Sequence, residues 1–145
     1  MATEVSKDEY RSQERKEAQY KRDVTRCENI EKSLDEDIRR LKKALETMRP
    51  CNSDFKSEYS SLDKTISAKY EFSGRKKDFI IDNVGNAVLN DGKYARDNVV
   101  NHALDEMEWL LTKKQNEWDA NHGDLLGFRR ALRSIGTWLR THFFN

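Results

Sequence analysis

A heptad-like repeat of apolar residues runs through the first third of the chain and constrains its fold more than any other feature. From Tyr10 to Met48 the positions at steps of three and four are mostly apolar, which is the spacing of a helix face that packs along a partner helix. Gln13, Glu17 and Glu31 also fall in this frame. Ile30 lies just beside this frame, which we expect to be strongest after Val24, with the first twenty residues frayed. The apolar positions of the frame are Tyr10, Tyr20, Val24, Cys27, Leu34, Ile38, Leu41, Leu45 and Met48.

The charged residues around this repeat support an exposed helical surface. An acid precedes a base by four residues in several places, and each such pair adds about 0.2 to 0.5 kcal/mol to a helix. Mixed signs along the whole arm favour a solvated face over a binding patch for one sign of charge. The pairs are Glu17 with Lys21, Glu28 with Lys32, Asp35 with Arg39 and Glu36 with Arg40.

Composition and patterning predict an all-α fold. The chain has one Pro, six Gly and no alternating apolar and polar run of strand length. A hydrophobic share of 36% beside 37% charged residues fits long helices that each bury a narrow stripe. We therefore expect a single helical domain over residues 1–145, built as an elongated antiparallel hairpin.

Proline and glycine positions predict where the helices end. Pro50 lacks an amide hydrogen and disfavours helical dihedrals at Arg49, so the first arm ends or kinks there; the sequence leaves open whether this is a kink or a full turn. His122 and Gly123 read as a helix stop, and Asp124 as the next N-cap. The predicted helices span 1–49, 53–72, 75–121 and 124–144, with a weak point near Asn90 inside an otherwise continuous third helix.

The last predicted helix is basic and amphipathic. Its arginines lie mostly opposite the apolar stripe, with Leu126 and Trp138 at the margins. Such a helix can fold back on the acidic part of the third helix, dock on another protein, or lie on an anionic membrane surface. The stripe consists of Leu125, Phe128, Leu132, Ile135, Leu139 and Phe143.

Two tryptophans on the third helix have two readings. Trp109 and Trp118 either pack in the helical seam or form an aromatic ledge for a partner helix, since Trp dominates binding hot spots. The candidate partner-binding residues are Trp109, Trp118, Leu125, Phe128, Leu132, Ile135, Trp138 and Leu139.

No pattern in the sequence indicates catalysis, a cofactor or a metal site. There is no Ser-His-Asp or Cys-His order with supporting context, no phosphate-binding glycine loop and no metal-ligand spacing. We assign His102 to a packed face, His122 to a helix cap and His142 to the tail. Cys27 and Cys51 are expected to be ordinary reduced thiols. The expectation is therefore a protein that is not an enzyme.

Charge and hydropathy also bear on partners and location. The net charge of +1 arises from 27 basic and 26 acidic residues that interleave, which disfavours nucleic acid as a partner. No apolar stretch approaches the roughly 20 residues that span a bilayer, and the first residues lack the apolar core of a signal peptide. We expect the chain to be made in the cytoplasm, with export by a route without a cleaved signal left open.

A glycine-marked corner lies between the two long helical patterns. Residues 70–79 read Tyr-Glu-Phe-Ser-Gly-Arg-Lys-Lys-Asp-Phe, in which Gly74 can close a helix and Phe72 can plug the end of a hairpin. The motif Phe72, Ser73, Gly74 resembles the W-x-G corner of the WXG superfamily, the early-secreted-antigen-like helical proteins handled by type VII secretion systems. Phe72 stands where that family usually has Trp.

The continuation of the corner resembles one subgroup of that superfamily. Basic residues followed by Phe79, and a Gly-x-Leu-hydrophobic-Gly entry at Gly123, are similar to proteins encoded beside LXG-domain toxins in Gram-positive bacteria. The resemblance covers roughly residues 20–145. It implies a chaperone-like targeting partner that binds the helical LXG domain of a toxin, together with a second small helical protein, for export of the toxin by the type VIIb system. Whether the chain itself is exported is left open. The alternative is a scaffold or membrane-surface protein anchored by its basic C-terminal helix. Whether the isolated chain forms a homodimer is left open.

Overall fold

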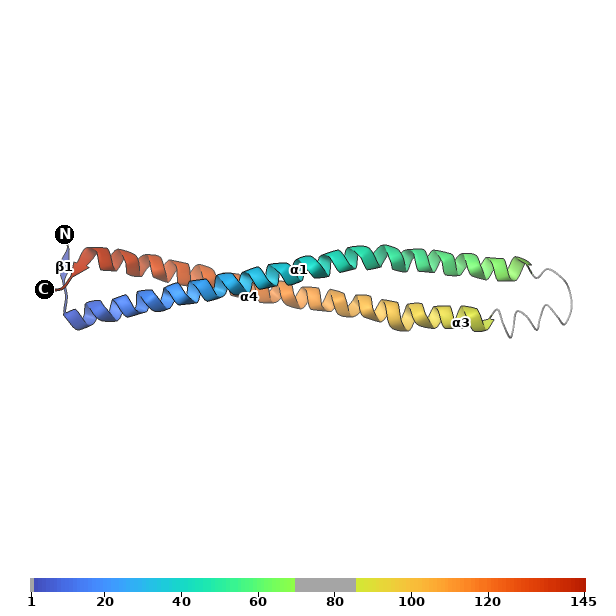
Figure 1. The fold of residues 1–145 in the computed structure, drawn as a ribbon, viewed down its shortest axis with the longest axis horizontal. Coiled ribbons are helices and arrows are strands. Elements are labelled where there is room, and N and C mark those ends of the chain that lie inside the picture. The colour runs from blue at the N-terminus through green and yellow to red at the C-terminus, as the bar shows by residue number, and fades with distance from the viewer. Residues whose placement is uncertain (1, 70–85) are drawn as a thin grey trace. The chain divides into compact units, whose positions relative to one another are not determined.

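The computed structural model describes residues 2–69 and 86–145, without the side chains of residues 62–69, 86, 88 and 89. Helices dominate this part of the chain, so the predicted all-α fold class is confirmed. The elements are β1 (Thr3–Glu4), α1 (Lys7–Lys69), α3 (Asn86–Tyr94), the π-helix η2 (Ala95–Val100), α4 (Asn101–Thr141) and β2 (His142–Phe143) (Figure 1).

The chain forms two units, and the long helices α1 and α4 each contribute to both. Unit 1 consists of residues 1–39 and 113–145, and unit 2 of residues 40–112. Each unit therefore pairs one part of α1 with a later part of the chain.

In unit 1 the first part of α1 packs antiparallel to the last part of α4. Contacts pair rising α1 numbers with falling α4 numbers, and the blue and red ends of the ribbon lie side by side (Figure 1). The three contacts that set this direction are Tyr10 Oη to the Leu139 carbonyl at 3.4 Å, Arg129 to Glu28 at 3.1 Å and Lys114 to Asp37 at 3.4 Å.

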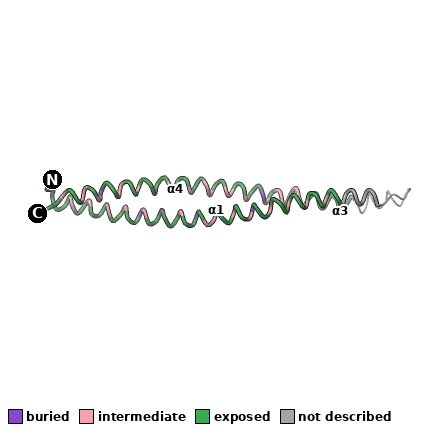
Figure 2. Tube along the Cα trace, turned by 90° about the horizontal axis from the view of Figure 1, so that it is seen from above, coloured by how far each residue is buried: buried purple, intermediate pink, exposed green. Residues whose placement is uncertain are grey.

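The heptad frame predicted for α1 is the packed face of the helix. Every apolar member of that frame is buried or half-buried, whereas Ile30 beside it is exposed. Buried and half-buried residues recur between exposed ones along α1 and α4 (Figure 2). The matching positions on the returning part of the chain, also at steps of four and three, begin at Val100 of η2, run along α4 and end at His142 of β2. On α4 they are Leu104, Met107, Leu111, Lys114, Trp118, Asn121, Leu125, Phe128, Leu132, Ile135 and Leu139.

Unit 2 is a second antiparallel pair. Arg49 binds Glu108 at 2.9 Å, and the Asn52 amide donates to Asn101 Oδ1 at 3.1 Å. Further along, the Tyr59 ring lies against the α3 and η2 segment. Among the described residues of this unit, Leu45 and Leu104 are the buried apolar side chains.

The predicted helix end at Pro50 is wrong. Pro50 lies inside α1, which runs on without a break to Lys69. The reason is the seam, because Met48, Asn52, Phe55 and Tyr59 continue the four-three spacing and are all half-buried. Packing along this stripe outweighs one lost hydrogen bond, so 1–49 and 53–72 are not separate helices.

The predicted helix stop at His122 and Gly123 is also wrong. Both residues lie inside α4, which continues to Thr141, so the segment 124–144 is not a separate helix. Asn121 and Leu125 occupy successive seam positions on either side of Gly123, and this continuity offsets a glycine cost of about 1 kcal/mol. Phe143 falls in β2 and is exposed, and His142 takes the last seam position instead.

The weak point expected near Asn90 is displaced and takes another form. Asn90 lies within α3, and the irregular stretch is η2, which begins at Ala95, five residues later in the chain. Gly92 of α3 and Arg96 of η2 both lie against the Tyr59 ring of α1.

The two ends of the chain, both in unit 1, are held by a helix cap and by strand pairing, and the first helix begins at Lys7. The Ser6 hydroxyl accepts a hydrogen bond from the Glu9 amide at 3.1 Å, which caps α1 in the Ser-x-x-Glu pattern of a capping box. Strand β1 pairs in parallel with β2, and the Val5 amide donates to the Phe143 carbonyl at 2.8 Å. The expectation that the first twenty residues fray is therefore wrong.

The surface charge pairs follow the predicted spacing in part. Glu17 and Lys21 form the expected pair at 2.9 Å. Glu28 instead binds Arg129 of α4, and Arg39 binds Glu36 at 2.9 Å. The Glu36 hydrogen bond and charge raise the pKa of Arg39 above its ordinary value.

Candidate protein-interaction surfaces

Most of the predicted partner-binding residues form the internal seam of unit 1. Leu125 is fully buried, Ile135 is 9% exposed, and Phe128, Leu132 and Leu139 are half-buried against α1. The Phe128 ring lies 6.3 Å from that of Tyr20, centroid to centroid. These apolar side chains are occupied by contacts inside the chain.

The C-terminal segment thus folds back, but not onto the acidic part of the third predicted helix. It packs against the first part of α1, through Arg129 with Glu28 and through an aromatic cluster near the chain ends. Tyr10 lies at the centre of that cluster, with ring centroids 6.1 Å from Trp138 and 5.1 Å from Phe144. His142 stacks on Trp138 at 4.0 Å.

Trp118 belongs to a polar layer in the seam of unit 1. Its ring stacks on His122 at 4.7 Å with 11° between the planes, and its buried Nε1 has no hydrogen-bond acceptor among the described residues. His122 Nδ1 lies 2.7 Å from Glu31 Oε1, and the Asn121 amide donates to the Cys27 carbonyl at 2.8 Å. His122 therefore lies inside α4, beside the seam position Asn121, and is not the predicted helix cap. Polar groups at such positions fix the register of paired helices.

Trp109, by contrast, is exposed. Its exposed fraction is 65%, the same as that of Tyr94, and Val99 is also largely exposed. His102, which we had assigned to a packed face, is exposed as well and pairs with Glu106 at 3.0 Å. The seam of unit 2 passes through Val100 and Leu104, on either side of His102, so the assignment of His102 to a packed face is wrong.

A charged cluster accompanies the π-helix in unit 2. Arg96 Nε lies 2.8 Å from Asp97 Oδ1, and the Arg96 guanidinium lies 5.7 Å from the centroid of the Tyr59 ring. The hydrogen bond from Arg96 lowers the pKa of Asp97 below its ordinary value, and the same bond raises the pKa of Arg96. The pair contributes stability above the ordinary pKa of Asp, and that contribution is lost as the pH falls through the lowered value.

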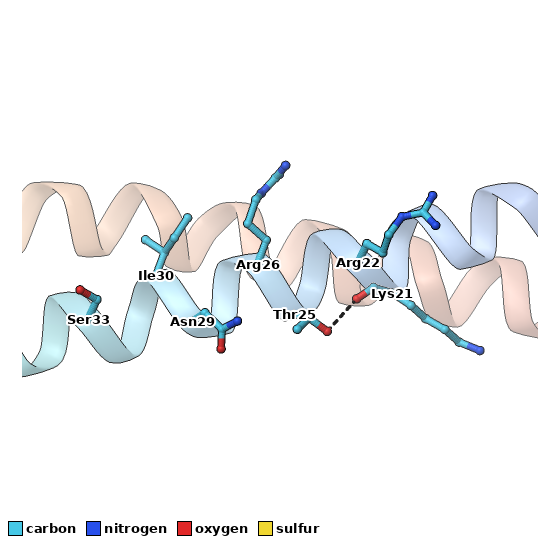
Figure 3. Close-up of a pocket in the computed structure, with 7 residues that line it drawn as sticks. All are labelled: Lys21, Arg22, Thr25, Arg26, Asn29, Ile30 and Ser33. Carbon is cyan, nitrogen blue, oxygen red and sulfur yellow. Dashed lines mark hydrogen bonds between the residues drawn. The ribbon is translucent and has the colours of Figure 1, made fainter.

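The outward side of α1 in unit 1 carries a hollow of about 670 Å³. All the residues that line it come from one helix, and the only hydrogen bond drawn there runs from the Thr25 hydroxyl to the Lys21 carbonyl (Figure 3). Ile30 is 41% exposed at its edge, beside short polar side chains. The lining residues are Lys21, Arg22, Thr25, Arg26, Asn29, Ile30 and Ser33.

The remaining features predicted from the sequence are the corner motif, the two cysteines, and the absence of metal sites and membrane spans. The corner Phe72, Ser73 and Gly74 lies outside the described residues. Cys27 is buried, Cys51 is exposed, and both are free thiols, as predicted. Within residues 2–69 and 86–145, no group of three His, Cys, Asp or Glu side chains is placed to hold a metal ion, and no helix is long and apolar enough to cross a membrane.

The described residues thus define an all-α protein whose helices pair along heptad seams and which leaves large apolar side chains exposed in both units. Comparison of the chain with protein-family models, with curated proteins and with solved structures finds no match.

Proposed function

We propose that this chain is a non-enzymatic helical adaptor that binds a helical segment of another protein. The observation that carries the proposal is the exposure of Trp109 and Tyr94, each at 65%, in a unit whose seam is already filled by other residues. Large aromatic side chains are costly to leave in water and are the residues that dominate protein interfaces. A partner helix that covers them would gain apolar burial without opening the seam.

The specific partner in this proposal is the helical LXG domain of a toxin, delivered to a type VII secretion system. Support for this finer assignment comes from the resemblance of Phe72, Ser73 and Gly74 to the WXG corner and from the similar entry at Gly123. The paired heptad helices are compatible with it. A second small helical protein, and passage of the adaptor itself through that system, belong to the same proposal.

The alternative of a membrane-surface protein is less well supported. An amphipathic helix binds a bilayer through its apolar face, and in residues 125–139 that face includes the buried Leu125 and Ile135. Deleting residues 124–145 would expose the seam of α1, so truncation cannot test membrane binding cleanly. Charge substitutions at exposed arginines serve that purpose better.

The adaptor proposal is tested by co-expression with an LXG-domain toxin encoded beside this chain, followed by co-purification. Trp109→Ser combined with Tyr94→Ser should weaken the complex at least about tenfold, the effect of losing hot-spot aromatics. Lys56→Ser, which alters an exposed side chain in the same unit, is the matched control and should leave it unchanged. A complex that forms equally well with the double variant would contradict the proposed contact, and no complex at all would contradict the adaptor role.

A further inference from the structure

Unit 1 contains a second hollow, of about 460 Å³, between α1 and α4. We call it the arginine groove and define it by the α4 residues Arg129, Leu132, Arg133, Gly136 and Arg140, with Glu17 and Lys21 on the α1 side. It is distinct from the hollow of Figure 3, although Lys21 lines both.

The charges of the groove are only partly compensated. Lys21 pairs with Glu17 at 2.9 Å, and Arg129 pairs with Glu28 at 3.1 Å. Arg133 has no ion pair in the part of the chain that the structure describes, and Arg140 reaches only the Thr137 hydroxyl, at 3.3 Å. Residues 125–145 contain four arginines and no Asp or Glu, so α4 itself supplies no carboxylate there.

The geometry places the two uncompensated arginines around a gap. Arg133, Gly136 and Arg140 follow one another at steps of three and four, so they share one face of α4. A Cβ atom at Gly136 would meet no atom within 4 Å, which leaves open space between the two long side chains. Seven residues of α-helix rise by about 10.5 Å, so the arginines are about two turns apart.

We propose that the arginine groove binds an acidic α-helix of the partner protein, which presents two carboxylates two helical turns apart. Arg133 and Arg140 each bind one carboxylate through paired N–H donors, the geometry that a guanidinium favours. The missing side chain at Gly136 lets the partner backbone approach between them. This inference rests on the proposed adaptor function and identifies the chemistry of the partner surface.

Two observations favour a protein helix over an anionic membrane. The guanidiniums border a concave space rather than a flat face, and the apolar residues that would enter a bilayer include Leu125 and Ile135, which are buried in the seam. Peripheral helices bind membranes by burying just such an apolar face. The fixed spacing of Arg133 and Arg140, in contrast, can be matched by two carboxylates at the same spacing on another helix.

The test measures binding of a synthetic helical peptide to the full chain by fluorescence anisotropy. The probe carries Glu at positions i and i+7, and a control peptide of the same composition carries the second Glu on the opposite face. We expect the probe to bind at least about tenfold more tightly than the control peptide, since charge-assisted hydrogen bonds between a guanidinium and a carboxylate are stronger than neutral ones. Arg133→Gln combined with Arg140→Gln should remove this preference.

Two further variants separate the groove from general charge and from misfolding. Arg130→Gln removes an exposed neighbouring arginine that does not line the groove, and it should change affinity less than about twofold. Gly136→Leu fills the gap with a good helix former, so it should weaken binding while helicity by circular dichroism is retained. Equal loss with Arg130→Gln, or unchanged binding with Gly136→Leu, would overturn the inference.

Binding to a membrane must be distinguished from binding to a helical peptide. Vesicles of phosphatidylcholine and phosphatidylserine that bind the chain through Arg133 and Arg140, while the peptide does not bind, would also overturn it. The adaptor role is judged independently by co-purification with the toxin. If the Arg133 and Arg140 double variant still co-purifies as well as the unaltered chain, the groove inference fails and the adaptor proposal stands.

Discussion

Leu125 and Leu126 are neighbours in α4 and have opposite environments. Leu125 is 0% exposed in the seam of unit 1, whereas Leu126 is 43% exposed. A turn of 100° per residue is enough to separate them, because the seam admits only a narrow stripe of each helix. The residue type alone therefore does not show which of the two leucines contributes to the free energy of unfolding.

We predict that Leu125→Ala lowers the free energy of unfolding by about 2 to 5 kcal/mol, since it removes buried apolar atoms and leaves a cavity. Leu126→Ala, the matched control with the same change of side chain, should alter it by no more than about 0.5 kcal/mol. Chemical denaturation followed by circular dichroism measures both. Similar losses for the two variants would show that the seam does not have the observed register.

At the scale of elements, α1 shows how packing overrides local signals. Pro50 cannot donate to the carbonyl of Glu46, and its ring crowds the preceding turn, yet the helix continues through it. The seam residues on both sides, such as Leu45 and Asn52, keep the helix in one register. The folded protein is therefore less stable by the free energy of the hydrogen bond and the close packing that Pro50 disrupts.

This cost predicts that Pro50→Ala stabilises the protein, by up to about 3 kcal/mol, because it restores one hydrogen bond and removes a clash. Pro50 is exposed, so the change should disturb no packing. Thermal unfolding followed at 222 nm would show a higher midpoint. As a control, Glu46→Ala, an exposed change one turn earlier, should leave it nearly unchanged. A lower midpoint for Pro50→Ala would mean that the proline is needed at this place.

The elements also show what the sequence can and cannot predict. The packed face of α1 follows from periodicity, because each member of the frame from Tyr10 to Met48 meets a partner helix. The ends of the helices could not be predicted from the sequence in the same way. The rules applied to Pro50 and Gly123 consider only neighbouring residues, whereas the seam depends on residues far apart in the chain. The π-helix η2 was not predicted from the sequence, and the contact of its Arg96 with Tyr59 of α1 is one that only the fold brings about. The cap at Ser6 could have been found from the Ser-x-x-Glu pattern.

The candidate surfaces were predictable only in part. Apolar residues of α4 such as Leu125 and Ile135 satisfied the pattern of a partner-binding stripe and proved to be an intramolecular seam. Sequence alone cannot tell which of two complementary stripes is filled by the same chain. The arginine groove was missed because it depends on residues of α1 and α4 that only the fold brings together.

At the scale of the whole molecule, the chain is organised as two units with separate cores. Unit 1 has its own buried residues, its polar layer around Trp118 and a fastening of the chain ends by β1 and β2. Unit 2 has Leu45, Leu104 and the cluster around the π-helix. Local stability can therefore differ between the units, because each depends on its own contacts.

We predict that weakening the aromatic cluster at the chain ends has a local effect. Tyr10→Ala removes ring contacts with Trp138 and Phe144 and the hydrogen bond to the Leu139 carbonyl. Hydrogen exchange should become faster in the first turns of α1 and the last turns of α4, with little change in unit 2. Tyr94→Ala, at an exposed tyrosine of unit 2, is the matched control. Faster exchange throughout the chain would contradict this separation.

The stacking of Trp118 on His122 and of Trp138 on His142 gives unit 1 two indoles held against imidazoles, while Trp109 in unit 2 faces water. Indole emission moves to longer wavelength in water, so the chain carries a native optical reporter in each half. Replacing Trp109 by Phe would leave only the emission of Trp118 and Trp138. Replacing Trp118 and Trp138 by Phe would leave only the emission of Trp109. The order in which the halves open or engage a ligand can then be followed by light, without any added dye.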